Sequence, residues 1–525
     1  AVDRAGIRSE TATRTLVFTR RYRLDVTSEY SLGSVTVKGT PSTALKLDST
    51  SGHTKRYIVQ PSVSVNLTAK PLNGHIFSHW SGAPSGALLS GPVMTMTMPA
   101  SDLAGVEAHF VPNPFHAHDG ASNVFQGLLR PLAVEDTSND CVGWITGKLA
   151  PATGAFSGKI SLSGLVHSFA AAFGGNGDCL FNVGKSKTPT LALPGGHTLE
   201  LSFETTEGVI QATLTKSGIL SQGMLERGIY SVNGLVPLTL LNARTSAGMA
   251  HNNQGFFTVA MPALEQEPAR PRHTYPQGDG YATLTLRNNG TLSLSGVLAD
   301  GTSITGSTML VSDSRAPVFV QLPTPGAATK GGSLGGHISL ADSGYCDAHC
   351  ADLLWIRPAV VQKTGATTAA KATQLYTDGW PQGISLGLIG SHYSTASSAQ
   401  DTLGLDTAGS GHSNCELYLH DGKLAADVMI NAFQINGNTV VKIPSTNKTF
   451  TLTVSAPKAV FNGTFTPNWT SPASAKPAFK GILLQRGGDS AGYGFFLSNR
   501  NADLNPESGR VILGAPLYET GDGEP

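Results

Sequence analysis

Short stretches in which apolar and polar residues alternate, separated by turn residues, recur along most of this chain. Residues 281–311 give one example, which is interrupted by Asn288-Asn289-Gly290 and by Asp300-Gly301. Alternation with a period of two places apolar side chains on one face of a β-strand, and Asn-Gly and Asp-Gly favour the tight turns of β-hairpins. We therefore expect a three-stranded antiparallel meander here.

The same pattern returns in residues 153–172 and again in residues 450–497, whereas helical periodicity is confined to a few short pieces. These units are too far apart for a solenoid or propeller, whose repeats span about 20 to 50 residues. We therefore expect an all-β chain built from successive antiparallel barrels or sandwiches. Asp279 and Asp300 lie beside glycines and are expected to serve in turns.

Composition narrows the class of protein and its partners. The chain has 525 residues, of which 61 are glycine and 14% are charged, so hydroxyl and amide groups supply most of its polarity. Thirty-six basic residues balance thirty-six acidic ones, which argues against a nucleic-acid partner. No apolar run is long enough to cross a bilayer, and the start Ala1-Val2-Asp3 resembles a chain cut after a secretion signal. We expect a secreted protein, extracellular or at the cell surface.

The segment NGHIFSHWSG, followed by PVMTMTMPASDLAGVEAHFVPNPF, occupies much of residues 73–115. It resembles the divergent B-repeat domain of internalin-like bacterial surface proteins, whose strands read G-y-x-F-x-x-W-s-G and then t-x-t-M-P-x-x-d-x-x-v-x-A-x-F. The resemblance covers residues 21–112 and implies a small β-grasp-like domain. His75 and His79 depart from the family pattern, as does the long connection of residues 40–56.

A second resemblance covers most of residues 122–515, through the words GLLRP, GAFSGKISLSG, PQGDGYATLTL, LLWIRP, FNGTF and GYGFFL. It is to a poorly characterised β-domain repeated in secreted proteins of environmental bacteria, and it implies no catalytic residue. The predicted organisation is a tail (1–20), the B-repeat-like domain (21–112), a linker (113–122), two barrel or sandwich domains (123–250 and 251–395) and a β-rich C-terminal domain (396–525).

Five cysteines are disulfide candidates: Cys141, Cys179, Cys346, Cys350 and Cys415. A Cys141–Cys179 bridge would close a loop long enough to add a few kcal/mol of stability. One further pairing among the remaining three would leave one thiol free. The alternative is a zinc site that also uses His349 and His412, but the paired cysteine knuckles of a strong zinc signature are missing.

Two other groups of residues suggest metal binding. Met94, Met96 and Met98 share one strand face, where the alternatives are a copper(I) site and a hydrophobic core, and alternation in a strand favours the core. The sequence His116-Ala117-His118-Asp119 offers three ligands in a linker, where solvated side chains are the simpler explanation. We therefore predict no metal site and no cofactor.

The sequence Gly488-Asp489-Ser490-Ala491-Gly492 matches the G-x-S-x-G motif of α/β-hydrolases. That motif needs a strand before the serine, a helix after it, and a histidine later in the chain. Here strands are expected on both sides, and no histidine follows Ser490. We interpret the motif as a hairpin loop and predict that the protein is not an enzyme.

Two functions remain. Carbohydrate binding needs exposed aromatic side chains beside polar groups, and Trp380 and Trp469 lie in sequences typical of loops. Assembly of identical subunits needs a strand that can join a neighbour's sheet, for which the candidates are Thr15, Leu16, Val17 and Phe18. The favoured hypothesis is a structural subunit of an extracellular filament, sheath or adhesive layer, and the alternative is a carbohydrate-binding or adhesin module.

Overall fold

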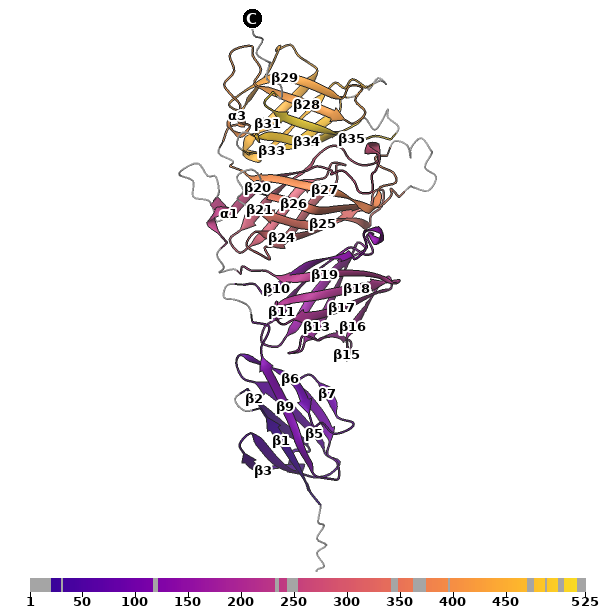
Figure 1. Cartoon of the computed structure of the whole chain (residues 1–525), viewed down its shortest axis with the longest axis vertical. Coiled ribbons are helices and arrows are strands. Elements are labelled where there is room, and N and C mark those ends of the chain that lie inside the picture. The colour runs from indigo at the N-terminus through magenta and orange to yellow at the C-terminus, as the bar shows by residue number, and fades with distance from the viewer. Residues whose placement is uncertain are drawn as a thin grey trace, which may run out of the picture. The chain divides into compact units, whose positions relative to one another are not determined.

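The computed structural model describes residues 20–29, 32–116, 121–231, 236–242, 254–340, 348–361, 374–394, 397–469, 476–486, 489–498 and 505–516. These residues are almost wholly strand and turn, which confirms the all-β class (Figure 1). The α-helices among them are short: α1 (Leu238–Asn242) and α3 (Ala399–Thr402). Two compact units are present. The first holds the described residues up to His116 together with residues 152–154 and 173–178, and the second holds the rest.

Two sheets form the first unit. The five-stranded sheet runs in the order β3 (Leu45–Ser51), β4 (Thr54–Val59), β1 (Tyr22–Ser28), β9 (Leu103–Pro112), β6 (His75–Ser81). The four-stranded sheet runs in the order β2 (Gly33–Thr40), β5 (Ser64–Pro71), β8 (Val93–Thr97), β7 (Leu88–Ser90). Strands β1 and β9 pair in parallel, and the other pairings are antiparallel.

Side chains from both sheets form one core in this unit. Met94 and Met96 of β8 are buried with Leu67 of β5 and with Phe110 of β9, and Met98 is buried just beyond β8. The interpretation of the three methionines as core residues is therefore confirmed. Alternation accounts for it, because every second residue of β8 faces the opposite sheet.

A β-bulge explains the spacing of Phe77 and Trp80 on β6. Phe77 pairs with Phe110 and Trp80 pairs with Ala108, so two residues of β6 oppose the single residue between them on β9. Without the bulge, residues three apart would point to opposite faces of the sheet. With it, the Phe77 and Trp80 rings both reach the core, and their centroids lie 5.6 Å apart.

The second unit contains three antiparallel sheets. The ten-stranded sheet runs β15 (Ser186–Thr188), β14 (Cys179–Val183), β13 (Leu165–Phe173), β12 (Ala155–Leu162), β11 (Gly143–Ala150), β10 (Val124–Pro131), β19 (Ile219–Arg227), β18 (Val209–Lys216), β17 (His197–Glu204), β16 (Thr190–Leu193). An eight-stranded sheet follows as β23 (Ser303–Met309), β22 (Thr291–Val297), β21 (Gly280–Arg287), β20 (Gln254–Met261), β27 (Trp380–His392), β26 (Ala348–Arg357), β25 (Lys330–Leu340), β24 (Arg315–Pro323). The other eight-stranded sheet runs β30 (Thr439–Lys442), β29 (Val428–Asn436), β28 (Cys415–Asp421), β35 (Ser508–Gly514), β34 (Ala491–Leu497), β33 (Ala478–Leu484), β32 (Val460–Phe465), β31 (Phe450–Ser455).

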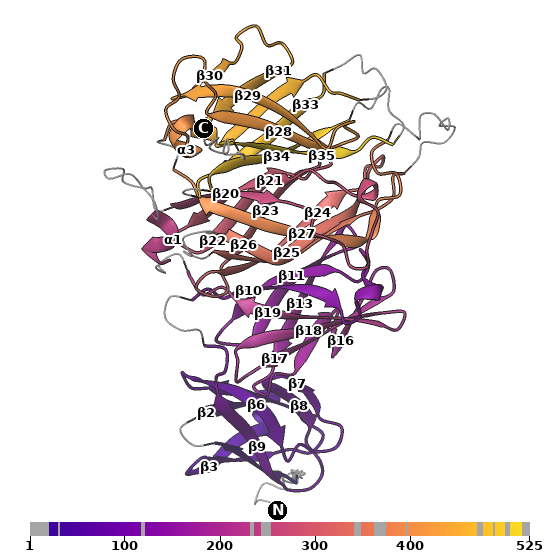
Figure 2. The ribbon, with the colours of Figure 1, turned by 45° about the horizontal axis from the view of Figure 1, so that its top comes forward.

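All three sheets share one topology. In each, the first and last strands in sequence pair with each other, so the two edges of the sheet fall in the middle of its sequence. Figure 2 shows this for β20 and β27, which lie side by side. The edges of that sheet also approach each other, since the Thr308 hydroxyl of β23 donates to the Pro317 carbonyl of β24. Each sheet is therefore close to a closed barrel, which protects most of its strand edges.

The expected meander of β21, β22 and β23 is confirmed by the pairing of its strands. The predicted hairpin of β12 and β13 and the predicted run of β31 to β34 are also confirmed. The two eight-stranded sheets have separate hydrophobic cores. They are joined by apolar contacts, since Ala260 of β20 is buried in the core of the other sheet, and by the 2.7 Å hydrogen bond from the Thr258 hydroxyl to the Leu483 carbonyl.

Candidate functional site

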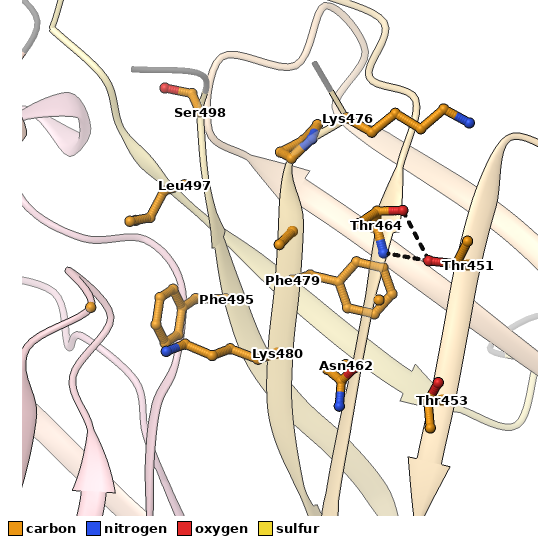
Figure 3. Close-up of a pocket in the computed structure, with 14 residues that line it drawn as sticks. Thr451, Thr453, Asn462, Thr464, Lys476, Phe479, Lys480, Phe495, Leu497 and Ser498 are labelled. Carbon is orange, nitrogen blue, oxygen red and sulfur yellow. Dashed lines mark hydrogen bonds between the residues drawn. The ribbon is translucent and has the colours of Figure 1, made fainter. Parts of the chain in front are cut away.

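A groove of about 730 Å³ lies over β31, β32, β33 and the end of β34 (Figure 3). Most of its polar lining comes from hydroxyl, amide and ammonium groups: Thr451, Thr453, Asn462, Thr464, Lys476, Lys480 and Ser498. The described residues that line the groove include no Asp or Glu. The groove is therefore basic and rich in hydrogen-bonding groups.

Strand register places these side chains in rows. Thr453 pairs with Asn462, and Asn462 in turn pairs with Lys480, so the three lie directly across adjacent strands. In the next row, the hydroxyls of Thr451 and Thr464 lie 2.9 Å apart, and the Thr464 amide donates to the Thr451 hydroxyl at 2.9 Å. Because directly opposite residues share one face of a sheet, the rows form a flat polar platform.

The alternation of the strands builds this platform. On β32, the buried Phe461 and Phe465 face the core, whereas Asn462 and Thr464 face outward. On β31, Phe450 is buried, and the exposed Thr451 follows it on the opposite face. The same phenylalanines that stabilise the sheet therefore fix the outward direction of the polar side chains.

Two lysines supply the positive charge. The Lys480 ammonium lies 5.2 Å from the centre of the Phe495 ring, and burial lowers the pKa of this lysine. Lys476 donates to the Lys448 carbonyl at 2.6 Å. Because Phe495 is only 2% exposed and lies under Lys480, the groove presents cations instead of an open aromatic face.

The tryptophans predicted to contact a glycan lie elsewhere. Trp380 begins β27 and is completely buried, with its ring centre 4.7 Å from that of Trp355 and 5.3 Å from the Arg357 guanidinium. The expectation that Trp380 is exposed in a loop is therefore wrong, because its ring fills the core of its sheet. Trp469 is half-buried against the neighbouring core and donates through Nε1 to the Gly422 carbonyl at 3.0 Å.

The cysteines do not form the predicted disulfides. Cys141, Cys179, Cys350 and Cys415 are free and buried, and Cys346 lies outside the described residues. Cys350 and Cys415 belong to two different cores. Burial raises the pKa of the Cys179 thiol to about 12, which keeps it protonated and unreactive.

A cluster of Cys350, Asp352 and His337 has the residue types of a nucleophilic site. The Asp352 carboxylate accepts from the Cys350 thiol at 3.2 Å and lies 2.7 Å from His337 Nδ1. Burial and the nearby carboxylate raise the pKa of Cys350 to about 12. A nucleophilic thiol needs an adjacent base that removes its proton, and here an anionic acid stands between the thiol and the imidazole. The arrangement stabilises the junction of β25 and β26 and does not activate sulfur.

Other predicted features can also be located. Ser490 lies in the connection between β33 and β34, where its hydroxyl accepts from the Arg486 amide at 2.9 Å, so the expected hairpin is confirmed. His116 is exposed, while His118 and Asp119 lie outside the described residues, as do Thr15, Leu16, Val17 and Phe18. In the described part of the chain, no three His, Cys, Asp or Glu side chains are gathered closely enough to enclose an ion. No helix found there is long and apolar enough to cross a membrane.

No protein-family model matches the chain, and no curated protein matches it. Among solved structures, it is similar to a double mutant of the vaccine antigen Transferrin Binding Protein B from Haemophilus parasuis Hp5. The two chains share 11% sequence identity, and the alignment covers 92% of this chain and 85% of that one. The TM-score of the match is 0.17.

Proposed function

We propose that this chain is a binding protein of the bacterial cell exterior and that the groove over β31 to β34 binds an acidic oligosaccharide. The observation that carries the proposal is the lining of the groove, in which two lysines accompany rows of hydroxyl and amide groups and none of the described lining residues carries a carboxylate. The secreted character inferred from composition and from the resemblance to bacterial surface proteins supports the same conclusion.

The chemistry of the lining selects the ligand class. Threonine hydroxyls and the Asn462 amide both donate and accept hydrogen bonds, as sugar hydroxyls do. Lysine ammonium groups attract carboxylates or sulfates and hold them by charge-assisted hydrogen bonds, which are stronger than neutral ones. The groove volume of about 730 Å³ falls in the usual range of ligand sites. A rigid sheet also lowers the entropic cost of binding, because its side chains are held in place beforehand.

A glycan array that contains neutral and acidic oligosaccharides tests the proposal, followed by calorimetry with the best ligand. We expect binding to acidic members, a loss of roughly tenfold or more in Lys476→Ala, and a smaller loss in Asn462→Ala. Lys185→Ala is the matched control, because Lys185 is an exposed lysine beyond the ten-stranded sheet's β14. Equal binding by Lys476→Ala and the unaltered protein would contradict the assignment, as would a complete absence of acidic ligands.

Self-assembly is a second candidate, favoured by an open edge in the first unit. Strand β7 is the edge of its sheet, and its Leu88 and Leu89 are 71% and 55% exposed. An exposed apolar edge strand is a template for pairing with another chain. We expect light scattering to show association that grows with concentration and that Leu88→Lys abolishes, while Leu132→Lys, at an exposed leucine of the second unit, has no effect. Monomers at every concentration would exclude this role.

A further inference from the structure

A long loop joins two paired strands of the second unit. Strands β20 and β21 pair with each other as far as Met261 and Gly280, so the loop between them consists of residues 262–279. A hairpin loop usually has about two to five residues, and loops longer than about 12 to 15 residues often carry function. This loop is therefore longer than the connection of the two strands requires.

Hydrogen bonds hold the loop in a defined shape. Gln266 is 4% exposed, and its side-chain amide donates to the Ser385 carbonyl at 3.0 Å and accepts from the Ser385 amide at 2.8 Å. Tyr275 is buried in the core of the sheet. The Gln277 side chain donates to the backbone carbonyls of Arg272 and Tyr275 at 2.8 and 3.1 Å. The loop is thus fixed to β27 near its start and folded back on itself near its end.

The loop and β35 line a pocket of about 380 Å³. The charged residues in its described lining are three arginines and one glutamate: Arg270, Arg272, Arg510 and Glu265. No described residue lines both this pocket and the groove over β31 to β34. The pocket is therefore distinct from the groove, and most of its charged lining is cationic.

The three arginines differ in their partners. Arg510 donates through Nε and one Nη to Oδ1 of the buried Asp279, so these two bonds do not use its second Nη. Arg272 donates through one Nη to the Asp421 carboxylate at 3.0 Å, and its side chain is 70% exposed. No described carboxylate lies within ion-pair distance of Arg270, which is partly buried. Carboxylates therefore hold two guanidinium groups in position, and the third brings a charge that no described carboxylate pairs.

We propose that this pocket binds the phosphate group of a small phosphate monoester. A guanidinium group presents several N–H donors in one plane and can bind phosphate oxygens through two parallel charge-assisted hydrogen bonds. A phosphate monoester carries a charge of about −1.5 to −2 at neutral pH and three terminal oxygens, which suit three guanidinium groups better than a single carboxylate does.

The size and the remaining charge of the pocket agree with this ligand. Its volume of about 380 Å³ is in the range of small-molecule sites, so it has room for the organic group attached to the phosphate. The carboxylate in its described lining belongs to Glu265, which is exposed to solvent, where salt and water screen its repulsion of an anion.

The test is calorimetry of the full chain with glycerol phosphate and with inorganic phosphate, at neutral pH and constant ionic strength. We expect one glycerol phosphate per chain, bound more tightly than inorganic phosphate. Arg270→Ala is expected to weaken binding roughly tenfold or more, and Arg272→Ala to weaken it less, because Arg272 is exposed and already paired. If Arg270→Ala misfolds, Arg270→Gln gives the same comparison with a polar side chain retained. Arg510 stays unaltered, because its removal would leave the buried Asp279 without its counter-ion.

Two control variants separate the pocket from other cationic side chains. Arg287→Ala removes an exposed arginine at the other end of β21 and is expected to leave the affinity unchanged. Lys476→Ala removes a lysine of the groove and is also expected to have no effect on glycerol phosphate binding. Full affinity in Arg270→Ala, or no binding of glycerol phosphate to the unaltered protein, would overturn the proposal. A loss of affinity in Lys476→Ala alone would assign the phosphate to the groove and would overturn it as well.

Discussion

Asp279 gives the second unit a stability that depends on pH in a defined direction. This residue immediately precedes β21 and is 1% exposed, and both Nε and an Nη of Arg510 on β35 donate to its Oδ1 at 3.1 and 2.9 Å. Its other oxygen, Oδ2, has no hydrogen-bond partner. Burial raises the pKa of Asp279 to about 6, and the attraction of Arg510 only partly offsets this.

The direction of this pH dependence follows from the pKa of Asp279 in the folded and in the unfolded protein. The unfolded carboxyl has a pKa of about 3.9, so the folded protein takes up the proton first as the pH falls. Asp279 therefore contributes stability at low pH, and this contribution is lost as the pH rises from about 4 through about 6. With these two pKa values, lowering the pH from about 7.5 to about 5 adds about 1.4 kcal/mol to the free energy of unfolding.

Asp279→Asn removes this titration while keeping the shape of the side chain. Urea unfolding of the full chain at several pH values, followed by tryptophan fluorescence, measures the free energy of unfolding of both proteins. We expect the difference between the unaltered protein and the variant to shift by about 1.4 kcal/mol in favour of the unaltered protein between about pH 7.5 and about pH 5. Asp378→Asn, at an exposed aspartate, serves as the control and is expected to show no shift. Parallel pH profiles for Asp279→Asn and the unaltered protein would contradict the raised pKa of Asp279.

Three further predictions concern stability and reactivity. Trp380→Ala is expected to lower the free energy of unfolding, measured in urea, by about 3–5 kcal/mol, because it empties a completely buried position. Trp469→Ala, at a half-buried position, is expected to lower the free energy of unfolding clearly less, and equal losses in the two variants would contradict the burial of Trp380. Mass spectrometry after alkylation is expected to find Cys141, Cys179, Cys350 and Cys415 unlabelled in the folded protein and labelled after denaturation, and a Cys141–Cys179 disulfide in a non-reducing digest would disprove this. Gly164→Ala is expected to lower the midpoint of thermal unfolding, since its Cβ would lie 1.5 Å from the Lys330 carbonyl oxygen at a positive φ; an unchanged midpoint would show that this contact can relax.

The alternation of apolar and polar residues along the chain made the strands and hairpins of the fold predictable. The strands around Asn288-Asn289-Gly290 and Asp300-Gly301 form as expected, because a hairpin depends on its own strand pattern and turn residues. Closure of the sheets was not predictable in this way. The pairing of β20 with β27 joins segments more than a hundred residues apart, and no short pattern specifies such a partner.

The sites were harder to predict than the strands. Asp279, expected to serve in a turn, is buried against Arg510, and Trp380, expected in a loop, fills a core, because tertiary packing overrides local propensity at both positions. In the sequence, the groove is visible only as the alternating polar residues Thr451, Thr453, Asn462 and Thr464. Alternation predicts that these side chains face outward, but the register between β31 and β32 is what places them next to one another in a flat polar platform.

Hydrogen exchange of the full chain, with and without a saturating acidic oligosaccharide, locates the bound ligand on the strands. We expect the ligand to slow exchange in β31, β32 and β33, which carry most of the groove lining, and to leave β10 to β19 unchanged. Protection confined to other strands, or binding without any protection of β31 to β33, would contradict the assignment of the groove as the binding site.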